Sequence, residues 1–356
     1  MQTKQVIWLV GPFPPPMHGQ AVYNAAFATH LEQLGELRVL ATGESLVSKL
    51  TSYSRILYAA FFHMRRTDVV YTSMPGQMGA WLFALVVAAL RLRGIRHFVH
   101  HHSYRSIVLG PLRVMRLVVA LGGHTQQHIL LSPKMRDKFA ALYLRSATSG
   151  RALALSNALL FCPKVAAVPP RPLRPVTLGH LSVLTPQKGV DTLLRIFRQA
   201  AIIDPELRLV IAGPVADQTL GHAIQAAIAD FPDRIDYRGP VSGAAKAQFY
   251  SDIDLFLLPT RLIDEAEPLV MLESYAAGVE FMANDRGCIA ERLRRPDRML
   301  TGNDDTDTAR LLEVVKQGAD DWEAVRQACG RHAADLHATA GAEARVLFSE
   351  MLAVSH

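Results

Sequence analysis

Short apolar segments recur along this chain, and each is followed by a stretch of helix length. In the first half they cover residues 5–10, 68–72, 97–101 and 128–132, with helices expected over 20–34 and from 133 onward. The second half resumes with strands expected at 176–182, 207–212, 235–237, 254–258 and 280–283, and helices at 191–203 and 268–277. The last 50 residues read as helical. Strands that alternate with helices predict an α/β fold with parallel sheets.

A proline-rich stretch separates the two series of strands. Residues 163–175 contain five prolines, which favour extended chain and exclude helix. We therefore expect an N-terminal domain over 1–165, a linker over 166–176 and a C-terminal domain over 177–335. The final helix, 336–356, is expected to pack back on the N-terminal domain. Two doubly wound halves would bind ligands at the carboxyl ends of their strands, in a cleft between them.

The cysteines and the apolar runs indicate the cellular compartment of the chain. Cys162, Cys288 and Cys329 are far apart and odd in number, which indicates neither a disulfide framework nor a zinc site and favours a reducing compartment. The N-terminal apolar run leads into a proline-rich loop without a small-residue cleavage site, so we interpret it as a strand and not a signal peptide. The longest uncharged apolar run, 78–90, is shorter than the ~20 residues that cross a bilayer. It predicts a buried or surface-docking helix.

Charge is divided unequally along the chain. Residues 1–175 carry 20 Lys+Arg and five Asp+Glu, whereas residues 176–356 carry 18 and 27. A basic half indicates an anionic partner, with nucleic acid, anionic lipid and a lipid diphosphate as candidates.

The basic residues of the first half lie among apolar and aromatic ones, as Arg55, Arg65 and Arg66 do beside Tyr58 and Phe61. This pattern suits a membrane interface; the alternative is a core helix with a basic outer face. Nucleic-acid recognition is disfavoured, since neither a basic sheet with interleaved aromatics nor a recognition helix is evident. We expect a cytoplasmic protein, peripheral on the inner face of the cell membrane.

The segment 254–273, DLFLLPTRLIDEAEPLVMLE, carries the strongest chemical signal. A strand, a loop with Glu265 and a helix with Pro268 in its first turn lead to Glu273. The first amides of such a helix, at Leu269 and Val270, are free to bind a diphosphate. A carboxylate two turns into the helix can accept hydrogen bonds from two ribose hydroxyls, as acidic residues do in dinucleotide sites.

In this context the chain resembles glycosyltransferase family 4, whose members are retaining enzymes of the GT-B fold. Glu265 and Glu273 match the family's two-glutamate motif, and Gly278 and Gly287 its small-residue turn and glycine loop. The segment LSVLTPQKGVDTLLRIF resembles the donor-phosphate loop, with Lys188 and Gly189 in register. The likeness covers about residues 176–292 well. It implies two Rossmann-like domains facing across a cleft, a nucleotide-diphosphate sugar as donor, retention at the anomeric carbon, no cofactor and no metal.

Two positions depart from the family's pattern. Ser182 and Val183 stand where the family has Gly-Arg, so Lys188 must carry more of the charge, or Arg261 substitutes for the arginine. Glu280 replaces a proline before the next strand. The sequence therefore leaves open the geometry of that strand and whether the enzyme is weakened.

In the N-terminal half, the resemblance puts His18 and Gly19 where the family has a glycine pair that faces donor phosphate or acceptor; a structural proline-rich loop is the alternative. His100, His101 and His102 end a strand. Adjacent strand residues point to opposite faces, so the three cannot easily chelate one metal ion. The family places one histidine near the donor sugar, which implies His102 as a catalytic residue beside Glu265, with His101 as the second choice.

Together these features predict a retaining hexosyltransferase that uses a nucleotide sugar and a lipid-linked saccharide acceptor in bacterial polysaccharide synthesis. Lys188, Gly189, Glu273, Leu269, Val270, Gly19 and His18 are the predicted donor-binding residues. A nucleotide-sugar 2-epimerase of the same architecture and a non-catalytic sugar-nucleotide binder remain alternatives. Residues 303–307, NDDTD, are interpreted as a solvated turn and not a metal site.

Overall fold

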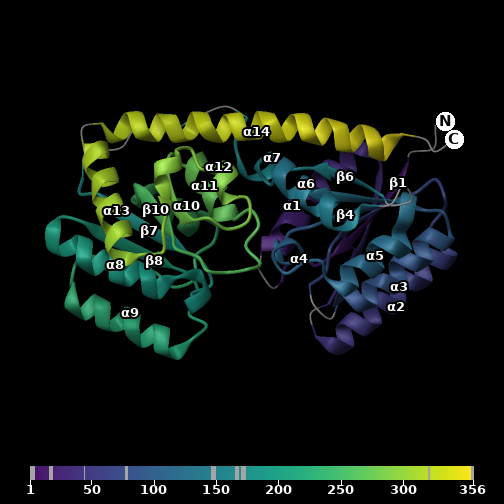
Figure 1. The fold of residues 1–356 in the computed structure, drawn as a ribbon, viewed down its shortest axis with the longest axis horizontal. Coiled ribbons are helices and arrows are strands. Elements are labelled where there is room, and N and C mark those ends of the chain that lie inside the picture. The colour runs from purple at the N-terminus through teal and green to yellow at the C-terminus, as the bar shows by residue number, and fades with distance from the viewer. Residues whose placement is uncertain are drawn as a thin grey trace. The chain divides into compact units, whose positions relative to one another are not determined.

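The computed structural model describes residues 5–15, 19–43, 45–76, 79–145, 150–164, 168–169, 174–319 and 321–353. The chain divides into two compact units (Figure 1). Unit 1 comprises Met1–Leu160 and Thr339–His356, and unit 2 comprises Phe161–Ala338. Most of the predicted linker, including residues 166–167 and 170–173, lies outside the described residues.

Unit 1 is built on a six-stranded parallel sheet with the order β2-β1-β3-β4-β5-β6. Its strands are β1 (Val6–Gly11), β2 (Glu36–Ala41), β3 (Val69–Ser73), β4 (Arg96–His100), β5 (Gln126–Leu130) and β6 (Arg151–Ala154). The chain changes direction across the sheet between β1 and β3. In open α/β sheets ligands bind outside the carboxyl ends of the strands at such a point.

Helices cover the sheet of unit 1. They are α1 (Gly19–Leu34), α2 (Leu46–Phe62), α3 (Gly79–Leu92), α4 (Arg105–Val108), α5 (Arg113–Gly122), α6 (Pro133–Tyr143) and α7 (Ala158–Phe161). Helices α2, α3 and α5 lie side by side (Figure 1). Their inner faces bury Ile56, Phe83 and Val118 against Val10 and Val70 of the strands. Each apolar side chain buried in this way contributes about 1.5–3 kcal/mol.

Unit 2 has a second parallel sheet of six strands, in the order β12-β11-β10-β7-β8-β9. The strands are β7 (Thr177–Leu181), β8 (Arg208–Ala212), β9 (Ile235–Tyr237), β10 (Leu255–Leu258), β11 (Glu280–Asn284) and β12 (Met299–Leu300). Counted within the unit, this order is 3-2-1-4-5-6 read from the β9 edge, the order of dinucleotide-binding domains. Its switch point lies between the neighbours β7 and β10.

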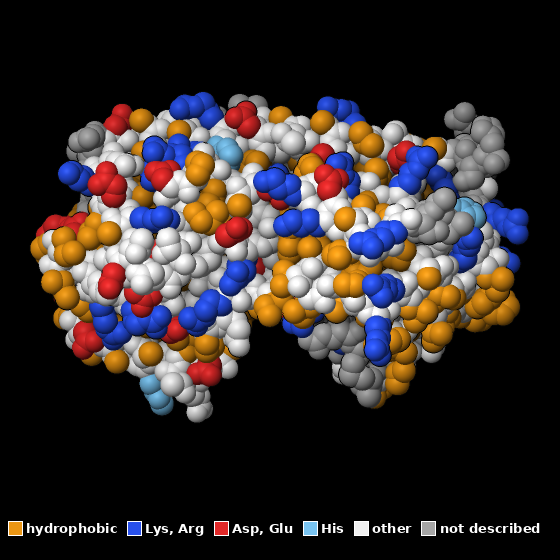
Figure 2. All heavy atoms as spheres, in the orientation of Figure 1, with side chains coloured by type: hydrophobic (Ala, Val, Ile, Leu, Met, Phe, Trp, Pro, Cys, Tyr) orange, Lys and Arg blue, Asp and Glu red, His pale blue; other side chains and the backbone are white. Residues whose placement is uncertain are grey.

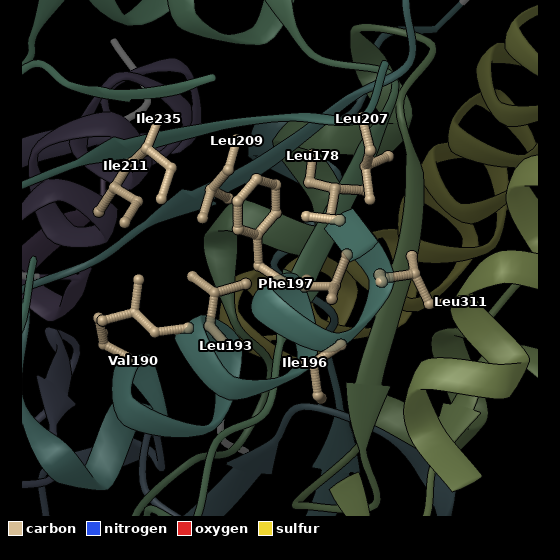
Figure 3. Packing of buried hydrophobic residues seen from close by; sticks show 14 of the residues in the cluster. Leu178, Val190, Leu193, Ile196, Phe197, Leu207, Leu209, Ile211, Ile235 and Leu311 are labelled. Atoms are coloured by element: carbon tan, nitrogen blue, oxygen red, sulfur yellow. The ribbon is translucent and has the colours of Figure 1, made fainter. Parts of the chain in front are cut away.

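The helices of unit 2 are α8 (Val190–Ile203), α9 (Gln218–Asp230), α10 (Gly243–Asp252), α11 (Leu269–Ala276), α12 (Ile289–Arg292), α13 (Asp304–Ala319) and the first part of α14 (Trp322–Leu352). Phe197 of α8 points toward Leu178 and Leu209 of the sheet (Figure 3). Leu311 of α13 belongs to the same core. The apolar face of α8 therefore anchors the helix that follows the β7 loop.

The last part of α14 belongs to unit 1. The Arg96 guanidinium donates to the carbonyls of Glu350 and Met351 at 2.9 and 3.0 Å. The Ser156 amide donates to the Glu343 carboxylate at 2.9 Å. No helix in the described part of the chain is long and apolar enough to cross a membrane.

The predicted fold class is confirmed, and each predicted strand is found within two residues of its expected bounds. Three strands were missed, β2, β6 and the two-residue β12, and all three lie at the edge of a sheet. An edge strand lacks the continuous apolar run of a strand that is covered on both faces.

Two local predictions were wrong. Residues 303–307 do not form a solvated turn, because α13 begins at Asp304 and Asp307 is buried. The Asp307 carboxylate accepts hydrogen bonds from the amides of Thr301 and Gly302 at 2.7 and 2.9 Å. Pro268 is the N-cap of α11 and not a residue of its first turn.

Candidate functional site

The loops at the switch point of unit 2 carry two of the predicted site residues. Strand β7 lies beside β10, with Leu178 opposite Leu255. The loop after β7 ends in a 3₁₀ turn, Pro186–Lys188, which is followed by Gly189 and α8. Glu265 lies in the loop after β10, ahead of α11. The topology therefore brings Lys188 and Glu265 to the position where doubly wound sheets bind nucleotides.

Glycines allow the loops around this point to touch. Gly189 has φ +80°, and a Cβ there would collide with the carbonyl oxygen of Pro259. The Arg261 amide donates to the Gln187 carbonyl at 2.8 Å. Gly287 has φ +58° and lies against the backbone of Glu265. Since only glycine is free of a Cβ at such an approach, both residues serve the packing of the site loops.

Glu265 and Lys188 form an ion pair. The Lys188 ammonium lies 2.7 Å from Oε2 of Glu265, and Glu265 is only 8% exposed. The Thr260 hydroxyl lies 3.5 Å from the same oxygen. The carboxylate is therefore held in one orientation, and the ammonium is positioned to meet a second anion. Two predicted residues, 77 positions apart in sequence, are brought together.

The start of α11 supplies free amides beside Glu265. Pro268 caps the helix, and the Met271 amide donates to its carbonyl. The amides of Leu269 and Val270 donate to no acceptor within the described ranges, and both residues are half-buried. Such amides, together with the helix dipole, attract a phosphate.

Glu273 lies one turn further along α11 and already has two partners. Its Oε1 is 2.5 Å from the Lys246 ammonium, and its Oε2 accepts from the Tyr250 hydroxyl at 2.7 Å. Burial, then the charge of Glu273, raises the pKa of Tyr250 well above its usual value, so the phenol stays a donor. Each carboxylate oxygen keeps a further lone pair for a ligand hydroxyl.

Lys246 and Tyr250 were missed by the sequence reasoning. They lie four residues apart on α10 and so share one helix face. This spacing was a usable signal, but nothing in the sequence shows that this face meets Glu273.

Arg261, the suggested substitute for a phosphate-binding arginine, is engaged elsewhere. Its guanidinium donates to both oxygens of Asp191, at 2.8 and 3.0 Å, and to the Pro186 carbonyl at 2.7 Å. The guanidinium is thus directed toward Asp191 and Pro186, whereas Lys188 is directed toward Glu265. Val183 is 49% exposed and supplies no charge.

Glu280, at the position of the family's proline, is fully buried. Its carboxylate pairs with Arg294 and lies 3.5 Å from Arg298. Strand β11 forms from Glu280 onward and pairs with β10 in parallel register. The buried ion pairs thus accommodate the glutamate, and the strand keeps its place in the sheet.

In unit 1, His102 lies next to the first helix. Its ring centroid is 4.5 Å from that of Tyr23 on α1, and 4.2 Å from that of His100. Burial lowers the pKa of His102 to about 3, so the imidazole is neutral near pH 7. Its Nε2 meets no hydrogen-bond partner in the described structure. Helix α1 begins at the predicted Gly19, whereas the predicted His18 lies outside the described residues.

His101 faces the other way. Its Nε2 lies 3.0 Å from Nδ1 of His128, and its ring packs on Phe139 in the core. Of the two predicted histidines, His102 is therefore the one with a ring nitrogen left for a ligand. Among the residues that the structure describes, no group of three His, Cys, Asp or Glu side chains is arranged to hold a metal ion.

A cavity of about 320 Å³ lies in unit 1 at the carboxyl ends of β1 and β3. Val10 and Phe83 contribute apolar walls, and Lys49, Tyr53 and Ser73 contribute polar atoms. The Lys49 ammonium forms no ion pair with any described residue. The sequence analysis did not identify this cavity, because its walls come from strand ends and two helices that are far apart along the chain.

Comparisons with known proteins agree with this geometry. Residues 175–317 match the family described as glycosyl transferases group 1. Anabaena HepE in complex with UDP is 16% identical, with a TM-score of 0.65 and 98% of each chain covered. Sucrose-phosphate synthase from Thermosynechococcus elongatus is 15% identical, with a TM-score of 0.68 over 98% of this chain and 100% of that one.

A glycosyltransferase from Rickettsia africae is 13% identical, with a TM-score of 0.70 over 99% of this chain and 100% of that one. No curated protein matches the chain significantly by sequence. The chain therefore has the GT-B fold of two Rossmann-like units, and its residues 175–317 form a domain of the glycosyl transferases group 1 type.

Proposed function

We propose that this protein is a retaining glycosyltransferase that transfers a hexose from a nucleotide-diphosphate sugar to a lipid-linked saccharide in bacterial polysaccharide synthesis. The observation that carries the proposal is the ion pair of Lys188 and Glu265 at the switch point of unit 2. It lies beside the free amides of Leu269 and Val270, so that cation, carboxylate and amides converge on one edge of the sheet.

This set of groups suits the departure of a nucleoside diphosphate. The leaving group gains negative charge in the transition state, and groups fixed in place before the reaction stabilise that charge without reorganisation. Lys188 and the α11 amides supply the positive ends. Glu273, oriented by Lys246 and Tyr250, is the acceptor we assign to the ribose hydroxyls. The structure of HepE was solved with UDP and with UDP-glucose, which supports a nucleotide sugar as donor here.

The proposed course is attack from the same face as the leaving group. Retaining glycosidases use a carboxylate nucleophile, but Glu265 is bound to Lys188, which favours a positioning and electrostatic role for it. His102, neutral and with a free Nε2, is assigned to the sugar. The proposed reaction uses no cofactor and no metal ion.

For the acceptor we propose the cavity of unit 1. Apolar walls and the unpaired Lys49 suit an amphiphilic molecule that carries phosphate. The basic character of residues 1–175 supports a lipid-linked acceptor. The protein would then work as a peripheral protein on the cytoplasmic face of the membrane.

The test is donor turnover by the purified full chain. We expect that a thermal-shift panel of nucleoside diphosphates and their sugars identifies a donor, and that the wild type hydrolyses or transfers its sugar. Glu265→Gln should lower turnover by about 10²-fold or more, as does the loss of other preorganised electrostatic groups. The exposed Glu206, also in unit 2, offers Glu206→Gln as a matched control that leaves turnover unchanged.

Product analysis separates the alternatives. Formation of an epimeric nucleotide sugar without an acceptor would identify a 2-epimerase. Binding of a nucleotide sugar without turnover, in the wild type and in Glu265→Gln alike, would identify a non-catalytic binder. An inverted anomeric configuration in the product would contradict the retaining course.

A further inference from the structure

The outer faces of α2 and α3 are apolar and exposed. On α2 and on α3 most of the exposed large apolar side chains lie about one or two helical turns apart (3 and 8 residues on α2, 4 and 7 on α3), so each set forms one stripe along its helix. The exposed fractions are 72% for Val47, 49% for Leu50, 58% for Tyr58, 42% for Phe61, 71% for Phe62, 55% for Trp81, 58% for Leu85 and 75% for Leu92. We call these eight side chains the α2–α3 face.

The α2–α3 face is continuous because the two helices pack side by side. Their inner sides are already used in the core of unit 1, through Tyr53 and Ile56 of α2 and Phe83 and Val86 of α3. Hydrophobic side chains gather over these helices in the surface view (Figure 2). Contiguous exposed apolar surface of this kind marks a contact with a protein or a membrane.

The chain segment that carries this face is strongly basic. Residues 45–136 contain twelve Lys+Arg and a single acidic residue, Asp68. Asp68 is buried, and its Oδ2 accepts hydrogen bonds from the Trp8 indole and the Arg65 amide. The face therefore has no exposed carboxylate around it within residues 45–76 and 79–136.

The exposed arginines near the face are not neutralised by any carboxylate that the structure describes. They are Arg55 on α2, Arg65 and Arg66 after α2, Arg93 after α3, and Arg113 and Arg116 on α5. None of them forms an ion pair with another described residue. Six unpaired guanidinium groups around an apolar surface complement a layer of lipid phosphates above acyl chains.

We infer that the α2–α3 face docks the protein on a bilayer that contains anionic lipid. Its apolar side chains enter the boundary between headgroups and acyl chains, and the surrounding arginines bind the phosphates. The rim of a typical protein contact mixes charges of both signs, whereas the described segments that carry this face, 45–76 and 79–136, expose arginines and lysines and no carboxylate. The inference rests on the proposed function only for the reason why the protein docks. The inner sides of the same two helices line the cavity assigned to the lipid-linked acceptor.

Trp81 provides a direct probe of docking. The chain has three tryptophans, and Trp81 is 55% exposed on the face whereas Trp8 is 6% exposed. We expect vesicles with about 30% phosphatidylglycerol to shift the protein's fluorescence to the blue, and lipids brominated in their acyl chains to quench it. Trp81→Phe should abolish both signals while it keeps the protein bound in a flotation assay.

Flotation then tests the two components of the face. Phe62→Ser combined with Leu85→Ser, or Arg113→Glu combined with Arg116→Glu, should each weaken vesicle binding by about ten-fold or more. The matched controls lie in unit 2: Ile202→Ser with Ile203→Ser, which are 79% and 67% exposed on α8, and Arg331→Glu. Binding should also fall from about 0.1 M to about 0.5 M salt.

Three results would overturn the inference: equal binding to zwitterionic vesicles, unchanged binding of the α2–α3 variants, or a dimer in solution that the same variants dissociate. The last would identify a second copy of the chain as the partner. Nucleotide-sugar hydrolysis by the variants, measured without lipid, distinguishes failure of this inference from failure of the proposed function, because the substituted residues lie outside the proposed donor site.

Discussion

Acidification should destabilise unit 1 through its buried histidines. His97 is 2% exposed and His128 is fully buried, and burial lowers the pKa of each to about 3. Burial also lowers the pKa of His100 and His101 well below the usual value. The folded unit therefore keeps these imidazoles neutral, whereas the unfolded chain protonates them near pH 6.5.

The sign and size of the effect follow from linkage. Because the folded pKa values are lowered, the unfolded state binds more protons between about pH 6.5 and 3, so stability is full above that window and is lost as the pH falls through it. At pH 5.5, one unit below the unfolded pKa, each group costs about 1.4 kcal/mol. His97 and His128 alone thus remove about 3 kcal/mol, a large fraction of the 5–15 kcal/mol typical of a domain.

The loss of stability can be measured by urea unfolding of the full chain at pH 7.5 and 5.5. Unfolding is followed by tryptophan fluorescence, to which the buried Trp8 contributes, and by circular dichroism. The variant His97→Gln keeps a partner for the Thr72 hydroxyl, 2.9 Å from Nε2 in the wild type, and removes one titrating group. It should reduce the pH dependence by about 1.4 kcal/mol between these two values. The exposed His222 gives the control His222→Gln.

Equal free energies of unfolding at the two pH values would refute this account of the buried histidines. So would an identical pH dependence in the wild type and His97→Gln, because the slope counts the protons that the two states bind differently.

Two further predictions concern unit 2. Glu267 and Arg292 form a buried ion pair at 2.5 Å, with 0% and 7% of their side chains exposed. Glu267→Gln should therefore lower the free energy of urea unfolding by about 3–5 kcal/mol. A loss below about 1 kcal/mol would show that the pair is solvated. Gly189→Ala should destabilise the β7 loop by more than the 1–3 kcal/mol expected of backbone strain alone, since its Cβ would also collide with Pro259. Gly239→Ala is its control, with φ +64° and open space around the new Cβ; equal thermal shifts in the two variants would contradict the packing argument.

The sequence by itself determined the architecture and the two residues at the switch point. Central parallel strands are covered on both faces and must be continuously apolar, so runs such as LFLL at β10 are legible without a structure. Lys188 and Glu265 each lie in the loop that follows such a strand, and the resemblance to a known family led us to expect both at the donor. Parallel strands end at one edge of their sheet, which is the physical reason why residues so far apart in sequence can meet there.

Tertiary structure alone decided which side chains meet across elements. The pairing of Glu273 with Lys246 and Tyr250 on α10, and the pairing of Glu280 with Arg294, both join elements whose distance depends on packing. The α2–α3 face is a further example. Helix periodicity shows that α3 is apolar on every side, but only the packed structure shows which of those sides the core covers and which it leaves exposed.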